Sequence, residues 1–573
     1  MKFPCRLLPS IFFTVAYLVL PFLAQAEVKV TKKIADTIFE NGRIYTFDAK
    51  GVVVQGLALK DGRIIGRGSK EQLAEFAGKN TRRIDLKGRM VTPGLHEGHG
   101  HLLRLGLQLI RLDLAQVASL EDVLTQVKKE KEQRPKGQWI QGRGWDQNLW
   151  PQKDFPSKID LDQVSREHPI YLGRVDGHAA WVNSRALELA GITAQTPDPE
   201  GGRILRDKDG QPTGILIDRA MGLVSRLLPA ESEADMERAI LAAVELCNRL
   251  GITSFHDAGS DRASLQILQN LIKDARLTMR VNAMLLGSDQ ALIDDYLARG
   301  PQSFGDNLLQ IRSVKLMADG ALGSRGAALL EAYSDEPHHH GIEILSEQEI
   351  YQLTKRLAKA GFQAATHAIG DKTNRSVLNA YERVMREEAG RDLRLRIEHA
   401  QILHPDDIER FGQLGVIASM QSTHLTSDAP WVPTRLGDER TKAGAYVWQK
   451  IKSSGARLVG GSDAPVESVN PMWGLYAAVT RQNQKGQPKG GWAKDQRLSM
   501  AEALETYTVH AAYAAFWEND LGTLEAGKYA DLVVFESDLF RLQQEPRKLL
   551  EDQVWLTMLA GEIVYQRGGD HSH

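Results

Sequence analysis

Two histidines, His99 and His101, follow an apolar run over residues 90–92 and a turn at Pro93-Gly94. The apolar run predicts a buried strand. Residues i and i+2 of an extended segment point to the same face, so both imidazoles can reach one point in space. Because neutral imidazole is the commonest nitrogen ligand for zinc and related ions, the pair predicts part of a divalent metal site.

The same His-x-His spacing occurs at His338/His340 and at His571/His573. The first of these pairs lies in a polar turn, which predicts a solvated loop. The second lies in the last three residues, where chains usually fray. We therefore expect only His99 and His101 to bind a metal.

Four more residues with ligand chemistry end predicted strands later in the chain: Lys315, His367, His399 and Asp463. A lone buried histidine or lysine is most often structural. A buried lysine is costly, however, unless it is paired, metal-bound or chemically modified. Two histidines, a lysine, two more histidines and an aspartate in this order therefore favour one shared site.

Short apolar strands alternate with amphipathic helices through the middle of the chain, which is typical of parallel βα units. Helices fit between the strands, for example over Glu231–Leu250 and Glu347–Ala360. Eight such units predict an α/β fold, a (β/α)8 TIM barrel, whose active site lies at the C-terminal ends of its strands. The predicted strands are the run ending at Thr92, Ile252–His256, Arg280–Leu286, Ile311–Met317, Phe362–His367, Leu395–His399, Val416–Gln421 and Arg457–Asp463.

The two chain ends predict a smaller β-sandwich around a barrel of residues 92–520. Its N-terminal part, residues 27–91, holds the hairpin signals Asn41-Gly42 and Asp61-Gly62, and strand patterns return over residues 521–570. A long segment of about residues 130–228, after the first barrel strand, predicts an inserted subdomain that covers the site.

Residues 1–26 predict a secretory signal peptide. Lys2 and Arg6 supply positive charge, residues 11–23 are nearly all apolar, and Ala24-Gln25-Ala26 fits a cleavage site. Cleavage before Glu27 would leave a periplasmic or secreted protein without a stable membrane anchor. A retained anchor is the alternative, although the apolar stretch is short for a bilayer span.

The composition is that of an ordinary soluble protein, with 42% hydrophobic and 25% charged residues and a formal net charge of −2. No basic stripe indicates a nucleic-acid partner. Cys247 would remain alone after cleavage and lies in a helical pattern, so we expect a core residue rather than a nucleophile. An extended β edge in the sandwich could pair subunits into a homo-oligomer.

These residues and motifs resemble the amidohydrolase superfamily of metal-dependent hydrolases, and within it the branch named for N-substituted formamide deformylase. The resemblance covers nearly the whole mature chain, including Gly144-Trp145-Asp146 and an Asp-Gly-His-Ala-Ala-Trp-Val-Asn motif ending at Asn183. It implies one or two divalent ions, with zinc the expected metal. The implied ligands are His99, His101, Lys315 (often carbamylated and bridging), His367, His399 and Asp463. The family usually has an aspartate two residues before the first histidine, where this chain has Glu97.

The implied mechanism uses a metal that lowers the pKa of bound water and polarises a carbonyl group. Asp463 would accept the water proton and deliver it to the leaving nitrogen. Candidates to stabilise the oxyanion are His178, in the insertion, and His424, after the seventh strand. Weaker candidates to line the substrate pocket are Trp145, Asp319 and Arg325, although the insertion's tryptophans are more typical of a core.

The sequence thus predicts a hydrolase of non-peptide carbon–nitrogen bonds in a small amide, N-substituted formamide or cyclic amide. Hydrolysis of an ester or carbamate, or deamination of a heterocycle, by the same site is the enzymatic alternative, because fold alone does not separate these reactions. A binding or regulatory protein that keeps the barrel is the non-enzymatic alternative. Such a protein would have no need for Asp463 or Lys315.

The signal peptide gives a first testable prediction. The exported chain should begin at or near Glu27, and N-terminal sequencing of protein from the periplasm or medium would show this. Exported protein that still begins at Met1 would contradict cleavage.

Overall fold

The computed structural model describes residues 33–114, 117–174, 178–199, 201–551 and 553–568. The predicted signal peptide and the pair His571/His573 lie outside these residues. Within the described ranges, the helices are all too short or too polar to cross a membrane.

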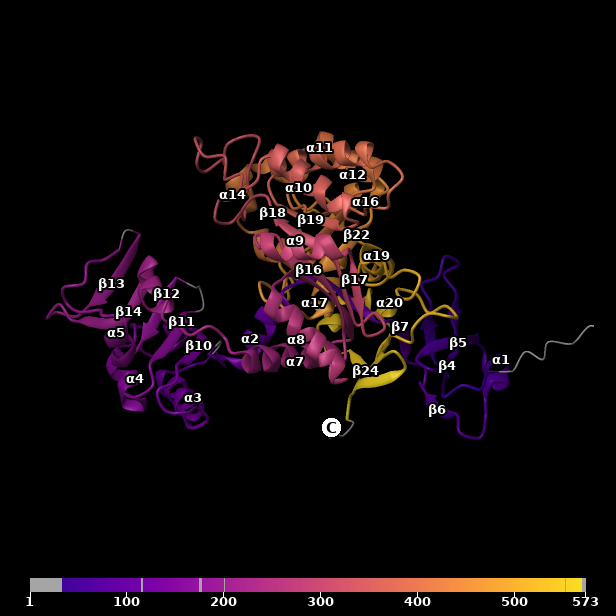
Figure 1. Ribbon diagram of the computed structural model, residues 1–573, viewed down its shortest axis with the longest axis horizontal. Coiled ribbons are helices and arrows are strands. Elements are labelled where there is room, and N and C mark those ends of the chain that lie inside the picture. Colours follow the sequence, from indigo (N-terminus) through magenta and orange to yellow (C-terminus); the bar gives the residue numbers. More distant parts are fainter. Residues whose placement is uncertain (1–32, 115–116, 175–177, 200, 552, 569–573) are drawn as a thin grey trace, which may run out of the picture.

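Eight parallel strands form the central sheet, and helices surround it (Figure 1). The predicted TIM barrel is therefore confirmed, and every predicted barrel strand except the first lies in this sheet. A short extra strand, β17 (Gln302–Phe304), pairs antiparallel with the fourth barrel strand. In chain order the barrel strands are β8 (Leu95–Gly100), β15 (Ile252–Ser260), β16 (Arg280–Leu286), β18 (Leu309–Met317), β19 (Gln363–Ala368), β20 (Arg396–His399), β21 (Ile417–Gln421) and β22 (Leu458–Gly461).

The first barrel strand is β8, and the prediction that it was the run ending at Thr92 is wrong. That run is β7 (Met90–Pro93), which pairs antiparallel with β23 (Leu532–Phe535) in the sandwich. Its apolar residues correctly predicted burial but did not indicate which sheet would bury them. Strand β8 has the sequence Leu-His-Glu-Gly-His-Gly, and this polar composition hides it from a search for apolar runs.

The barrel closes where β8 meets β22. The Asp463 N–H donates to the His99 carbonyl over 2.7 Å, and the His101 N–H donates to the Ala464 carbonyl over 2.8 Å. A Cβ atom on Gly98 would lie 2.4 Å from a backbone carbonyl oxygen of β22, so only glycine permits this approach. Closure therefore brings residues from opposite ends of the barrel sequence together.

Serine residues are the N-caps of two of the predicted helices. Ser232 accepts a hydrogen bond from a backbone N–H in the first turn of α7 (Glu233–Arg249), and Ser346 does the same for α10 (Glu347–Lys359). Such caps satisfy N–H groups that have no partner within the helix. Other helices around the barrel include α2 (Leu102–Ile110), α8 (Arg262–Lys273), α9 (Gln290–Arg299), α11 (Asp371–Glu387), α12 (Pro405–Leu414), α16 (Trp448–Ser453), α17 (Pro471–Thr480), α18 (Met500–Thr506) and α19 (Val509–Ala514).

Both chain ends build the sandwich, as predicted. The Asp61-Gly62 turn joins the antiparallel pair β4 (Gly56–Lys60) and β5 (Arg63–Gly68). The hairpin predicted at Asn41-Gly42 is wrong, because the chain there crosses from one sheet to the other. The remaining strands are β1 (Thr37–Glu40), β2 (Arg43–Tyr45), β3 (Val53–Val54), β6 (Arg82–Asp85), β24 (Val554–Leu559) and β25 (Glu562–Gln566).

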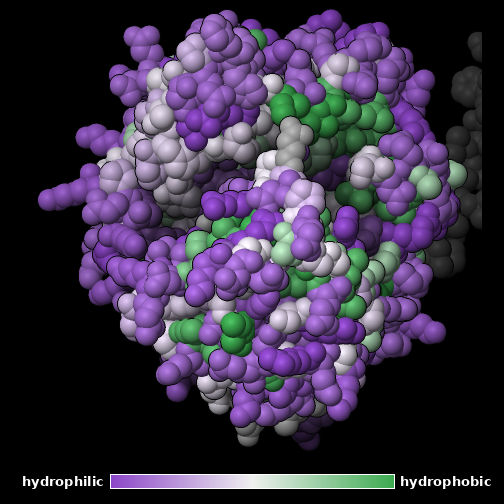
Figure 2. Space-filling model, turned by 90° about the vertical axis from the view of Figure 1, so that its left-hand side faces the viewer, coloured by the Kyte–Doolittle hydropathy of each residue, from purple (hydrophilic) through white to green (hydrophobic). Residues whose placement is uncertain are grey.

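The inserted subdomain stands to one side of the barrel, with the N-terminal sandwich strands on the other side (Figure 1). Its six-stranded sheet begins at β9 (Leu112–Asp113), earlier than predicted. Viewed from this side, the surface is mostly hydrophilic with scattered apolar patches and is hollowed (Figure 2). The other strands and α-helices are α3 (Leu120–Glu132), β10 (Ile140–Trp145), α4 (Lys158–Val164), β11 (Ile170–Arg174), β12 (Ala179–Val182), α5 (Ser184–Leu189), β13 (Gly202–Arg206), β14 (Pro212–Asp218) and α6 (Gly222–Ser225).

A buried ion pair joins the barrel to the sandwich. Arg280 of β16 contacts Asp531, next to β23, over 2.7 and 3.1 Å, and both side chains are nearly inaccessible. Removing one partner leaves an uncompensated buried charge, at a cost of about 3–5 kcal/mol. We predict that Asp531→Ala lowers the free energy of unfolding by this amount, measured by urea denaturation followed by circular dichroism.

Asp295→Ala provides the control, because Asp295 pairs with Arg262 and Arg299 on the surface. Exposed pairs contribute at most about 1 kcal/mol, so this variant should unfold almost like the wild type. Equal stabilities of the two variants would contradict a structural role for the buried pair.

Candidate active site

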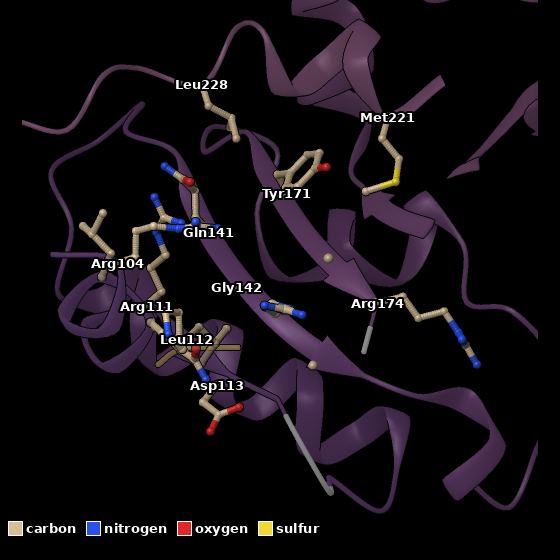
Figure 3. A pocket seen from close by; sticks show the side chains of 16 residues that line it. Arg104, Arg111, Leu112, Asp113, Gln141, Gly142, Tyr171, Arg174, Met221 and Leu228 are labelled. Atoms are coloured by element: carbon tan, nitrogen blue, oxygen red, sulfur yellow. The ribbon is translucent and has the colours of Figure 1, made fainter. Parts of the chain in front are cut away.

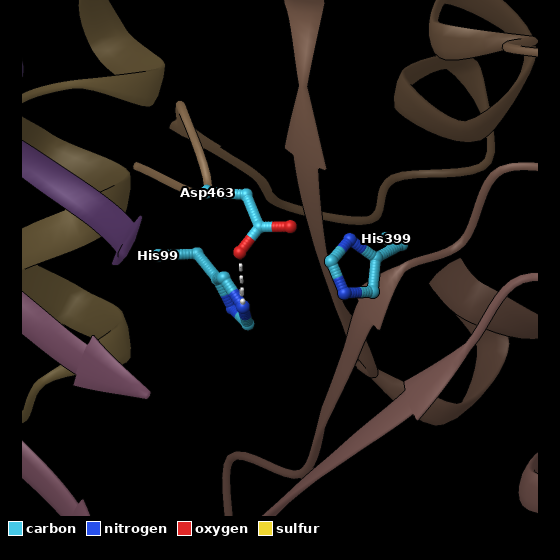
Figure 4. A group of neighbouring side chains, drawn as sticks. All are labelled: His99, His399 and Asp463. Carbon is cyan, nitrogen blue, oxygen red and sulfur yellow. Dashed lines mark ion pairs between the residues drawn. The ribbon is translucent and has the colours of Figure 1, made fainter. Parts of the chain in front are cut away.

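The six residues that the sequence selected as metal ligands meet at the mouth of the barrel. The tightest group is His99, His399 and Asp463, whose ligand atoms all lie within 4.8 Å of one another (Figure 4). The Lys315 Nζ lies 3.3 Å from His99 Nε2. The His101 Nε2 lies 3.0 Å from Asp463 Oδ1. The imidazole of His367 completes the cluster, with its ring centroid 4.5 Å from that of His399.

Two of these residues leave their strands in a left-handed backbone conformation. His399 has φ 77° and Asp463 has φ 60°. Such values are uncommon outside glycine and cost of order 1–3 kcal/mol each. Arg396 and Glu398 share the face of β20 that points into the barrel, so a regular strand would turn His399 to the other face. The left-handed conformation instead directs the imidazole of His399 into the mouth, where Nδ1 contacts Gln421 Oε1 at 2.8 Å.

Burial sets the protonation states of the cluster. It lowers the pKa of His99 to about 4 and that of His367 to about 3, with the Lys315 charge as the next cause in both. Burial likewise holds the pKa of His399 well below its usual value. Burial alone would raise the pKa of Asp463, but the neighbouring histidines hold it well below the ordinary range. Neutral imidazoles and an ionised carboxylate are the forms that bind metal ions.

Buried polar atoms at the mouth that make no hydrogen bond within the described residues include Nε2 of His367 and Nε2 of His424. Leaving a buried polar atom unpaired is costly, so such atoms in a native site indicate a partner that the chain itself does not supply. Nitrogen and oxygen donors of this kind suit zinc and similar divalent ions. The residues present therefore fit a divalent metal.

A buried carboxylate orients His99. The Glu398 Oε2 lies 2.5 Å from His99 Nδ1, which leaves Nε2 to face Lys315. Arg396 contacts both oxygens of Glu398, over 2.8 and 3.1 Å, and both side chains are completely buried. A carboxylate on the second nitrogen of a ligand histidine fixes its tautomer and strengthens it as a donor. Sequence analysis missed this pair, although two charged residues two positions apart on a buried strand were a usable signal.

Glu97 stands where the family pattern has aspartate, and it connects the two strands that close the barrel. Its Oε1 accepts hydrogen bonds from the His99 N–H over 3.0 Å and from the Ser462 N–H over 2.8 Å. Its Oε2 accepts one from the Ser462 hydroxyl over 2.8 Å. Burial raises the pKa of Glu97 to about 8. Glu97 therefore holds the turn that carries Asp463.

The two oxyanion candidates lie in different places. His424, in α13 (Ser422–Asp428), lies at the mouth with Nε2 3.8 Å from Asp463 Oδ2. His178 lies in the insertion, contacts Asp218 at 2.7 Å and has a side chain that is 75% exposed. The structure therefore brings His424, but not His178, to the cluster. Motif position could not decide this, because the placement of the insertion is a tertiary property.

Of the three residues predicted to line the pocket, Trp145 is wrong because it is fully buried in the insertion, whereas the roles of Asp319 and Arg325 at the substrate stay predictions. Trp145 is fully buried in the core of the insertion, where its indole N–H donates to a backbone carbonyl. Asp319 is buried next to His367 and accepts three backbone N–H groups, which fixes loops beside the cluster. Arg325 pairs with Asp335 within its own loop. Each side chain is thus engaged by the protein itself.

A (β/α)8 barrel whose mouth gathers histidines, a lysine and an aspartate defines the class of metal-dependent hydrolases. A family model described as "Amidohydrolase family" matches residues 82–565. The chain belongs to the amidohydrolase family and is an enzyme that hydrolyses carbon–nitrogen bonds.

Individual relatives match most of the chain. The chain is 36% identical over 543 residues to Protein LONG AFTER FAR-RED 3 of Arabidopsis thaliana, covering 93% of this chain and 92% of that protein. It is 28% identical over 548 residues to N-substituted formamide deformylase of Arthrobacter pascens, covering 93% and 99%. Its fold resembles the crystal structure of an uncharacterized metal-dependent hydrolase from Pyrococcus furiosus, with a TM-score of 0.73, 31% identity and coverage of 88% and 99%.

The carboxylate behind His99 gives a testable prediction. Glu398→Gln keeps the size of the side chain but removes the charge that orients the imidazole. Loss of such a partner typically weakens metal binding about 10–100-fold, and we expect that range in a competition titration with a chelating dye. Glu347→Gln on the exposed start of α10 is the control. Unchanged metal affinity in Glu398→Gln would exclude the orienting role.

Proposed function

We propose that this enzyme hydrolyses an amide, an N-substituted formamide or a cyclic amide. The observation that carries the proposal is the convergence of His99, His399 and Asp463 within 4.8 Å at the barrel mouth. The likeness to N-substituted formamide deformylase supports a small substrate with one carbon–nitrogen bond to cleave. The buried, ionised state of Asp463 supports proton transfer during that cleavage.

The proposed ligands of the metal, for which zinc is our candidate, are His99, His101, Lys315, His367, His399 and Asp463. When bound, such an ion lowers the pKa of water and polarises the substrate carbonyl. Asp463 accepts the proton of the attacking water and passes it to the leaving nitrogen, which departs as a neutral amine. His424, whose Nε2 has no hydrogen bond among the described residues, is placed to donate to the developing oxyanion.

Lys315 has a further proposed role. Burial lowers the pKa of its amine, which favours the neutral form that reacts with carbon dioxide to give a carbamate and a proton. The carbamate would add carboxylate-type oxygens to the cluster and allow a second ion to bind. Metal analysis distinguishes one bound ion from two, and the intact mass of the protein shows whether Lys315 is carbamylated.

The catalytic roles give a direct prediction. His99→Ala and Asp463→Asn should each lower kcat/KM for an amide or formamide substrate at least about 10³-fold, because one removes a ligand and the other the proton acceptor. Activity is measured on protein loaded with a divalent ion, and metal content by elemental analysis.

His338→Ala is a matched control, since this exposed histidine belongs to a His-x-His pair that is not part of the ligand cluster. It should keep wild-type activity and metal content. Turnover retained in His99→Ala or Asp463→Asn would refute the mechanism, and a protein that binds no divalent ion would refute the hydrolase proposal as a whole.

A further inference from the structure

A cavity of about 500 Å³ lies between the barrel and the inserted subdomain (Figure 3). Helix α2 bounds it on the barrel side, and β10 and β11 bound it on the side of the insertion. Its lining also includes Pro465, which follows Asp463 by two residues. The cavity therefore reaches the turn that carries the proposed proton acceptor, and its size is within the range of small-molecule sites.

Positive charge dominates the lining. It contains four arginines, and Asp113 is the only carboxylate among the described lining residues. Two of these arginines are already paired, Arg111 with Glu231 and Arg174 with Asp146. A site with this balance of charge favours an anionic ligand.

The other two arginines lack protein partners. The guanidinium groups of Arg104 on α2 and Arg143 on β10 form no hydrogen bond or ion pair with any described residue. Arg143 shares one face of β10 with Gln141, which also lines the cavity. Guanidinium groups bind carboxylates through charge-assisted hydrogen bonds, so two arginines on opposite walls form a suitable pair of donors.

The remaining lining is largely apolar. Leu107 contributes from α2, and Leu112, Met221, Leu228 and the ring of Tyr171 contribute from the insertion. Figure 3 shows Met221, Leu228 and Tyr171 on one side of the cavity and Arg104 beside Arg111 on another. A ligand for this cavity would therefore combine an apolar chain with a charged end.

We propose that this cavity binds the part of the substrate remote from the scissile bond, and that this part is an apolar chain ending in a carboxylate. The inference rests on the proposed amide hydrolysis at Asp463. Arg104 and Arg143 bind the carboxylate while the leucines and Met221 cover the chain. Binding energy from such a remote group selects anionic amides over neutral ones.

The test compares ω-formamido carboxylic acids of increasing chain length with their uncharged ω-formamido carboxamides. For the best chain length, kcat/KM of the acid should exceed that of the carboxamide at least about tenfold, which corresponds to about 1.4 kcal/mol. Arg104→Gln and Arg143→Gln should each reduce this ratio toward one. Arg82→Gln is the control, since Arg82 is an exposed arginine on β6 of the sandwich and should leave the ratio unchanged.

Calorimetric titration with the same acid and carboxamide separates this inference from the proposed function. If no amide is hydrolysed but the acid binds more tightly than the carboxamide, and both arginine variants remove the difference, the anion site stands and the hydrolase proposal fails. Equal kcat/KM and equal affinity for acid and carboxamide would overturn the anion site. A preference for the acid that survives in both variants would also overturn the anion site, because that result would indicate direct binding of the carboxylate to the metal.

Discussion

The close approach of the first and last barrel strands is the constraint on which the site depends. Gly98 has no side chain to hold β22 away, and the Asp463 N–H donates to the His99 carbonyl over 2.7 Å. Glu97 then binds the backbone and hydroxyl of Ser462 across the same seam. Since Asp463 and His99 are separated by most of the barrel sequence, only this closure places them in one cluster.

Burial at the mouth determines which chemistry the cluster can perform. In water these histidines would be partly protonated near neutral pH, whereas burial keeps His99 and His367 neutral. The same burial would be unfavourable for Glu398 without Arg396, whose charge helps to hold the pKa of that carboxyl well below its usual value. The barrel interior thus contains an ion pair beneath the site, where many TIM barrels have branched apolar residues. That ion pair orients His99 without being exposed to solvent.

The barrel and the insertion contribute different parts of the proposed site. The proposed ligands come from barrel strands and the turns after them, whereas the cavity that Pro465 helps to line takes one wall from the insertion. Variation in the insertion can therefore change which substrate binds while the reacting groups stay fixed, since function on a barrel lies in the loops and not in the fold. The tryptophan core that includes Trp145 lies within the insertion behind that wall, and Trp145 is not among the residues that line the cavity.

The sequence by itself determined the barrel, the pairing of the chain ends and the cluster of ligand-type residues, because each depends on local periodicity or on residue chemistry. It did not show that β8 is a barrel strand, because the polar side chains that serve the site replace the apolar pattern of a strand. It also did not separate His424 from His178, or show that Trp145 is buried. The position of His178 follows from where the insertion lies beside the barrel, and the burial of Trp145 follows from the packing of the insertion's own core. Both depend on contacts between residues far apart in the chain, so only the tertiary structure decided them.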